Sequence, residues 1–222
     1  MKKLLMLALC ALLFVPSTYA KSLRDKKEQG LKLDGHAGIS LSTVSRSLDS
    51  KNEMANFIVG PKLGLGASYA FIKKLSVKAE LNYVQRGFAD DHNTWLHSES
   101  GRTTTRIHNI EVPVMLSWRN QVNDNVSMHF GGGAFFAYGF KGNTVTNFKD
   151  GLEKDKLNYD TFEIGKLSHN NCGLALDFSL MYQKTFVGIR YNLGLSNMSD
   201  NSKLDLKMKS HAIDFCIGYR FK

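Results

Sequence analysis

The stretch from His211 to Phe221, HAIDFCIGYRF, decides the fold. Every second residue from His211 through Ile213 to Phe221 lies on one side of a predicted strand, and that side is mainly apolar and aromatic. The other side carries small or charged residues such as Gly218 and Arg220. Because an unpaired edge on such a strand invites aggregation, the strand needs a partner. We interpret it as the closing strand of a barrel, paired with the first strand.

Seven earlier stretches show the same alternation, so the sequence predicts eight strands. They are expected over about 31–42, 57–71, 75–86, 109–119, 126–139, 172–182, 187–196 and 211–221. The segments between them alternate in length, with long polar loops over about 43–56, 87–105, 141–170 and 197–209 and short turns over about 72–74, 120–125 and 183–184. Pro113 has no amide hydrogen to donate, so we expect a bulge or a local irregularity there.

The first twenty residues have the pattern of an export signal. Lys2 and Lys3 precede an apolar run over residues 4–15, and small residues in PSTYA stand before a plausible cleavage point. We expect residues 1–20 to be a secretory signal peptide, residues 21–30 a short periplasmic tail, and residues 31–222 one barrel domain. After the signal no apolar run reaches 18 residues, which excludes a transmembrane helix but leaves a membrane barrel open.

Charge and cysteine content limit the partners. Without Lys2 and Lys3 the formal net charge falls from +9 to +7, and the basic residues are scattered rather than clustered on one element. We therefore expect no nucleic-acid partner. Cys172 and Cys216 fall on opposite faces of their predicted strands, so we expect no disulfide between them.

The layout of the strands favours a barrel in a membrane. With alternating connections, all long loops lie at one end, and the short turns lie at the other with both termini. A secreted lipocalin-like barrel, with its apolar face inside, is the alternative. Glycine argues against it, because eleven of the nineteen glycines fall on the polar face, where a narrow lumen needs small residues: Gly38, Gly60, Gly64, Gly66, Gly131, Gly133, Gly139, Gly173, Gly188, Gly194 and Gly218.

Aromatic residues on the apolar face gather near both predicted ends of the strands, as the two interfacial girdles of a membrane barrel would. The group near the short turns comprises Tyr69, Phe71, Trp118, Tyr182, Tyr219 and Phe221, and the group near the long loops comprises Phe57, Tyr83, Phe136 and Tyr138. The sequence therefore predicts an all-β fold, an eight-stranded antiparallel up-and-down transmembrane β-barrel in the bacterial outer membrane, with both termini periplasmic.

Several segments resemble the PorT-like outer-membrane β-barrel family, described also as outer membrane protein β-barrel domains. The segments are GHAGISLS (35–42), ELNYVQRG (80–87), IEVPVML (110–116), GGGAFF (131–136), RYNLGLSN (190–197) and GYRF (218–221). This resemblance implies an eight-stranded outer-membrane barrel. It does not assign a function, and the link of the namesake to type IX protein secretion need not extend to this chain.

Charged residues on the polar face are the main candidate site. The predicted lumen charges are Asp34, Lys78, Glu80, Glu111, Asp177, Arg190, Asp214 and Arg220, with Lys32, Lys62 and Arg86 beside them. Because a lone buried charge costs several kcal/mol, we expect them to pair and plug the barrel. A narrow pore for small solutes is the alternative. Asp34 and Arg220 lie near the seam between the first and last strands, so we expect them to form a pair.

No catalytic, cofactor-binding or metal-binding residues are assigned, and we do not expect an enzyme. Ser210 beside His211 near the outer rim would suit a lipid-modifying enzyme, but the sequence offers no third group. His92 and His97 match no standard set of metal ligands.

The expected function is therefore that of a structural, adhesion or secretion-associated component acting through its outer loops. Loop aromatics that could contact a partner, or pack on one another, are Trp95, Phe148, Tyr159 and Phe162. The expected partners are outer-membrane lipid, the barrel-assembly machinery through the C-terminal strand, and other envelope or secretion proteins.

Overall fold

The computed structural model of the chain describes residues 30–48, 51–72, 74–93, 100–149, 156–164, 167–199 and 207–221. The predicted signal peptide and most of the predicted tail lie outside these residues. Within the described residues, no helix has the length and apolar character needed to cross a membrane.

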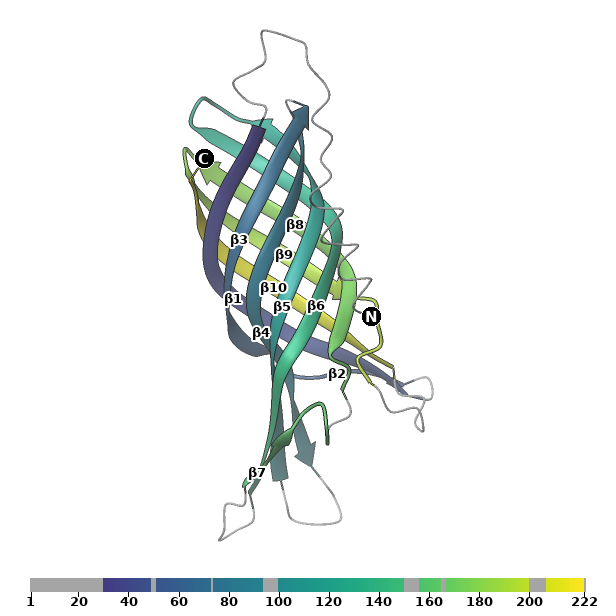
Figure 1. Cartoon of the computed structure of the whole chain (residues 1–222). Helices are drawn as coiled ribbons and strands as arrows, with labels where there is room; N and C mark the ends of the chain where they lie inside the picture. Colours follow the sequence, from purple (N-terminus) through teal and green to yellow (C-terminus); the bar gives the residue numbers. More distant parts are fainter. Residues whose placement is uncertain are drawn as a thin grey trace.

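The described residues form ten antiparallel strands in one sheet, and eight of these strands close into a ring (Figure 1). The ring strands are β1 (Gly30–Leu48), β3 (Ile58–Ile72), β4 (Leu75–Asn93), β5 (Ser100–Gln121), β6 (Val126–Lys149), β8 (Asn170–Tyr182), β9 (Thr185–Gly194) and β10 (Lys207–Arg220). Two short strands flank the ring, β2 (Lys51–Met54) on β1 and β7 (Lys156–Asp160) on β6. The all-β eight-stranded barrel predicted from the sequence is confirmed.

The seam between the first and last strands closes the barrel. β1 and β10 pair over fourteen positions, from Asp34 opposite Arg220 to Ser47 opposite Lys207. The backbone amide of Phe221 also donates to the carbonyl of Leu33. The prediction that the C-terminal strand pairs with the first strand is therefore correct, and neither ring edge is left unpaired along this seam.

The direction of the two faces follows the alternation in the sequence. Leu65 on β3 is 64 % exposed, whereas Lys62 on the same strand is 1 % exposed and points into the barrel. Leu176 and Ile217 on other strands are also largely exposed. An outward apolar surface that continues around a barrel is the surface that hydrocarbon covers in an outer-membrane protein.

The short turns lie together at one end of the barrel. Ile72 pairs with Leu75, and Tyr182 pairs with Thr185 across a two-residue turn in which Gln183 has a positive φ. The backbone amide of Arg220 donates to the carbonyl of Lys184, so the described C-terminus lies at this turn end as well. The opposite end, where β5, β6 and β7 project beyond the ring in Figure 1, is called the outer end below.

Three of the long loops predicted at the outer end contain strand instead. The predicted loop 43–56 contains the end of β1, which continues to Leu48, and all of β2. The predicted loop 87–105 contains the end of β4, which continues to Asn93, and the start of β5 at Ser100. The predicted loop 141–170 contains the end of β6, which continues to Lys149, and all of β7. The last two of these segments are rich in threonine, which suits a strand. Their hydrophobic alternation is lost because the residues lie beyond the band that contacts hydrocarbon.

The irregularity expected at Pro113 lies mainly elsewhere. The β5–β6 register shifts between His108 and Asn109, where β6 carries one extra residue, Phe140, between the partners Gly139 and Lys141. The pairing of β4 with β5 omits the positions opposite Val112 and Pro113 but resumes in the same register. The missing amide of Pro113 therefore interrupts the ladder locally, while the bulge occurs where the sheet leaves the barrel.

Candidate functional site

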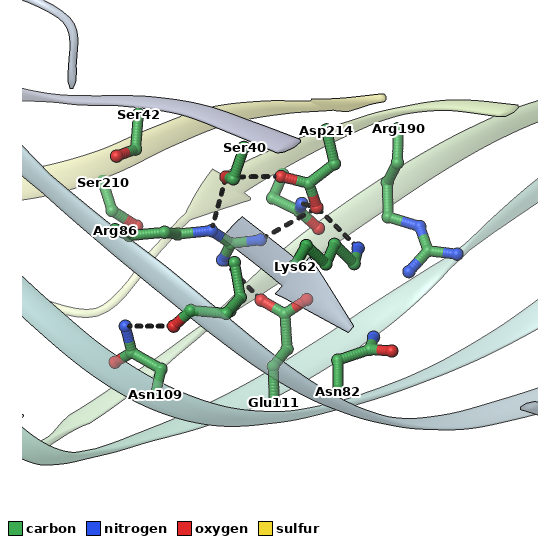
Figure 2. A network of polar contacts seen from close by, with 12 residues as sticks. Ser40, Ser42, Lys62, Asn82, Arg86, Asn109, Glu111, Arg190, Ser210 and Asp214 are labelled. Carbon is green, nitrogen blue, oxygen red and sulfur yellow. Dashed lines mark hydrogen bonds and ion pairs between the residues drawn. The ribbon is translucent and has the colours of Figure 1, made fainter. Parts of the chain in front are cut away.

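The polar side of the strands fills the middle of the barrel with a network around Asp214 (Figure 2). Its Oδ2 accepts from Lys62 Nζ at 2.7 Å and from Arg86 Nη2 at 3.1 Å. Ser40 Oγ donates to Asp214 Oδ1 at 2.6 Å, and Asn192 Nδ2 donates to Oδ2 at 2.9 Å. One carboxylate thus connects side chains from β1, β3, β4, β9 and β10.

Arg86 extends this network to β5. Its Nη1 donates to Oε2 of Glu111, which is completely buried. Figure 2 shows Arg86 lying between Glu111 and Asp214, so one guanidinium contacts two carboxylates on different strands. Paired charge of this kind is tolerated inside a protein because each ion is compensated by a hydrogen-bonded partner.

A second network surrounds Glu80 nearer the turn end. Arg190 binds Glu80 through two hydrogen bonds of 2.7 and 2.8 Å and also binds Asp177 Oδ1 at 2.8 Å. Lys78 Nζ lies 2.6 Å from Glu80 Oε1, and Asn82 Nδ2 donates to Oε2 at 3.0 Å. Together the two networks pair four cations with four carboxylates, which leaves this part of the lumen near neutral.

Inward glycines make room for these side chains. A Cβ added at Gly64 would lie 1.9 Å from Asn82 Oδ1 and 2.5 Å from His36 Nε2. These two atoms form a hydrogen bond of 2.9 Å with each other. A Cβ at Gly66 would lie 2.4 Å from Asp34 Oδ2. Within the lumen, glycine on one strand therefore allows a long polar side chain on the next, as the sequence pattern predicted.

An apolar cluster lies above the charged networks at the outer end. It comprises Val44, Ala55, Phe88, Ile107, Leu167, Met198 and Met208, and Phe162 packs against it. Phe88 is two residues beyond Arg86 on β4, so the cluster begins where the ion network ends. Sequence analysis missed this cluster because Phe88 and Met208 fell within stretches assigned to polar loops. The signal that could have found it is that each is a large apolar residue in an otherwise polar stretch.

Some space remains at the turn end. A cavity of about 30 Å³ there is lined by charged side chains that include Lys78, Asp177 and Arg220. This volume has room for roughly two water molecules. The space therefore reaches the Glu80 network through Lys78 and Asp177.

Asp34 and Arg220 lie opposite each other on the seam, as expected, but their side chains form no ion pair in the described structure. Arg220 Nη1 instead donates to the Met181 sulfur at 2.9 Å. Both carboxylate oxygens of Asp34 are buried without a hydrogen bond, and His36 Nδ1 lies 3.8 Å from Asp34 Oδ2. The expected direct pair is therefore wrong, because cross-strand partners can point their ends in different directions.

The serine and histidine considered at the outer rim are not partners. Asn171 Nδ2 donates to Ser210 Oγ at 2.7 Å. His211 instead contacts two groups on other strands, with Nε2 3.1 Å from Ser45 Oγ on β1 and Nδ1 2.9 Å from Tyr191 Oη on β9. Adjacent residues on a strand point to opposite faces, which separates Ser210 from its neighbour.

Several other predicted positions can be located. Of the aromatic girdle residues, all except Tyr83 are largely exposed on the outside of the barrel, and the Tyr83 hydroxyl bonds His108 Nδ1 at 2.7 Å. Phe162 stacks on His169 with ring centroids 3.9 Å apart. Trp95 and His97 lie outside the described residues, as do the side chains of His92 and Phe148. Cys172 is exposed and Cys216 partly buried, both as free thiols.

Comparison with known proteins supports the same architecture. The structure resembles outer membrane protein OprG from Pseudomonas aeruginosa, with 15 % identity, a TM-score of 0.50, and coverage of 87 % of this chain and 97 % of that chain. It also matches Ail, the attachment invasion locus protein of Yersinia pestis, with 16 % identity, a TM-score of 0.35, and coverage of 86 % and 99 %.

No curated protein matches the sequence. The family model described as outer membrane protein beta-barrel domain matches residues 22–200, which is most of the chain. This match agrees with the closed ring and its apolar outer surface. The chain therefore belongs to the outer membrane protein β-barrel domain family.

Proposed function

We propose that the protein is a closed barrel of the bacterial outer membrane that works through its outer surface, as a structural, adhesion or assembly component. Its turn end, with both chain termini, faces the periplasm, and its projecting strands face outward. The short turns and long outer segments support this orientation, because outer-membrane barrels keep short turns on the periplasmic side.

The observation that carries the proposal is the filled lumen. Asp214 on β10 and Arg86 on β4 bond to each other within the lumen although β1 and β3 lie between their strands, and both side chains are buried. The apolar cluster around Phe88 and Met208 then covers this network on the outer side. A solute would have to displace several ion pairs and this cluster, so we favour a closed scaffold over a narrow pore.

The projecting sheet supplies the surface on which a partner would act. β4, β5, β6 and β7 remain hydrogen-bonded beyond the ring, from Arg106 opposite Asn143 outward to Arg102 opposite Asn147. Arg102, Arg106 and Lys141 are exposed there. Exposed Asp91 and Asp160 lie on the same sheet, so it presents charges of both signs to a polar envelope or surface component.

Single-channel recording in planar bilayers tests the closed lumen. We expect no stable openings from the purified wild-type protein, while a porin recorded in the same bilayers confirms that the assay detects conduction. The double variant Glu80→Ala with Arg190→Ala removes one network and serves as a check that a loosened lumen produces current noise. Resolved, reproducible openings of the wild type would overturn the proposal in favour of a pore.

A matched deletion tests the role of the projecting sheet. Removing residues 102–105 from β5 and 144–147 from β6 deletes paired positions, so Gly101 still faces Phe148 and Arg106 still faces Asn143. We expect the shortened protein to fold as a barrel and to lose partners that the intact protein retains in pull-downs from envelope extracts. Unchanged capture by the shortened protein would exclude this sheet as the binding surface.

Membership of the PorT-like family is part of the same proposal. The segments ELNYVQRG and RYNLGLSN support a PorT-like barrel, and with it a role beside envelope or secretion proteins. The C-terminal strand with exposed Tyr219 and Phe221 supports recognition by the barrel-assembly machinery during insertion. Outer-membrane lipid is the remaining expected partner.

A further inference from the structure

We propose that Ser45 and His211 form a nucleophile and base pair that hydrolyses lipid esters at the outer boundary of the membrane. His211 Nε2 lies 3.1 Å from Ser45 Oγ, and His211 Nδ1 lies 2.9 Å from Tyr191 Oη. A base in contact with both a hydroxyl nucleophile and an orienting group is the arrangement that serine hydrolases use. This activity goes beyond the scaffold function proposed above.

Closure of the barrel creates the arrangement. Ser45 stands opposite Lys209 across the β1–β10 seam, and Thr43 stands opposite His211, so Ser45 and His211 are diagonal neighbours. Tyr191 stands opposite Ile213 on the other side of β10 and is therefore diagonal to His211 as well. Three strands thus place three polar side chains on one outward face.

One tautomer of His211 gives each ring nitrogen a role in the proposed reaction. With the proton on Nδ1, the ring donates to the Tyr191 oxygen, and Nε2 is left to accept the proton of Ser45 Oγ. Tyr191 therefore acts as a positioning residue that holds the imidazole toward the serine. The side chains of Ser45 and His211 are partly exposed, so a substrate and water can reach them.

The depth of the pair indicates the substrate class. On the outward face of β10, Phe215 and Ile217 are exposed to the apolar surroundings, whereas Lys207 and Lys209 follow on the outer side of His211. His211 thus stands where the apolar band ends and the polar outer segment begins. Ester carbonyls of membrane lipids lie at this boundary between hydrocarbon and headgroups.

The reaction balances with water as the second reactant. Ser45 Oγ attacks the ester carbonyl carbon as its proton moves to His211 Nε2, and the alcohol leaves with that proton when the carbon–oxygen bond breaks. Water then attacks the acyl-serine, gives a proton to His211, and releases the carboxylic acid while Ser45 regains its proton. Lys209, exposed and opposite Ser45, can approach the negative oxygen of each tetrahedral intermediate.

A fluorophosphonate probe tests the nucleophile on the full-length mature protein folded in detergent micelles. Ser45 is expected to displace fluoride and become labelled, and labelling of Ser45→Ala and His211→Asn is expected to fall to the level of heat-denatured protein. Ser210→Ala is the matched control, because this neighbouring serine bonds Asn171 instead, and it should label like the wild type. Equal labelling of Ser45→Ala and Ser210→Ala would overturn the assignment.

Hydrolysis of phospholipid in mixed micelles, measured as fatty-acid release, tests the activity. We expect Ser45→Ala and His211→Asn to reduce the rate at least about 100-fold, and Tyr191→Phe to lower kcat less severely with KM unchanged. Heat-modifiable electrophoretic migration shows whether each variant is folded. If folded wild-type protein releases no fatty acid beyond the Ser45→Ala background, the proposal fails, while the closed-barrel function remains testable by conductance.

Discussion

Replacing Asp214 by asparagine tests whether the lumen network holds the barrel together. The change keeps the size of the side chain and its hydrogen bond from Ser40 but removes the negative charge beside Lys62, whose side chain is 1 % exposed. Arg86 keeps Glu111 as a partner, so the buried charge that loses its partner is mainly that of Lys62. Breaking a buried pair by removing one partner costs about 3–5 kcal/mol, and we expect Asp214→Asn to lower the free energy of unfolding by that amount.

Substituting the other partner measures the contribution of the Lys62–Asp214 ion pair. Lys62→Met leaves Asp214 with Arg86, Ser40 and Asn192, so we expect a smaller loss of about 1–3 kcal/mol. The double variant no longer contains the Lys62 cation, so no buried charge is left without a partner there. We therefore expect its loss to fall short of the sum of the two single losses by about 2 kcal/mol.

Urea unfolding in lipid vesicles, followed by tryptophan fluorescence, gives these free energies. Asp91→Asn is the matched control, because Asp91 is more than half exposed, lies 3.7 Å from Arg102, and accepts from Asn56 an exposed hydrogen bond that an asparagine oxygen can also accept. An exposed pair contributes about 0–1 kcal/mol, so this variant should unfold nearly like the wild type. If Asp214→Asn matched this control, or if the losses at Asp214 and Lys62 simply added, the charged network would not be what stabilises the barrel.

Three further predictions use the same unfolding assay or the folding yield. Gly64→Ala should cost about 1–3 kcal/mol, because its Cβ would displace Asn82 or His36, whereas Gly132→Ala, whose nearest contact would be 3.5 Å, should change little; equal effects would contradict the close packing of the lumen. Asp34→Ala and Arg220→Ala should show a coupling energy well below the about 3–5 kcal/mol of a buried ion pair, since the two side chains form no ion pair, and a coupling energy of that size would show that they pair in the membrane. Phe221→Ala should lower the amount of protein assembled in the outer membrane of cells but leave refolding in detergent unchanged; a loss in both would show a purely structural role for this exposed ring.

Much of the fold could be predicted from local pattern. The alternation in HAIDFCIGYRF specifies a strand and its two faces, because successive side chains point to opposite sides whatever the partner is. The two residues between Tyr182 and Thr185 likewise allow only a tight turn. Local pattern failed beyond the hydrocarbon band, where Thr103 and Thr144 continue their strands through backbone pairing without an apolar face.

The sequence by itself determined that the strands alternate, that the apolar side faces outward, that glycines and charges share the lumen, and that the last strand needs the first. Only the tertiary structure decided which charges meet, because pairs such as Arg190 with Glu80 lie 110 residues apart and depend on the register of every strand between them. The same register separates Ser210 from His211 and brings Ser45 to it across the seam. Side-chain alternation is a property of each strand alone, whereas these contacts arise from closing all eight strands into one ring.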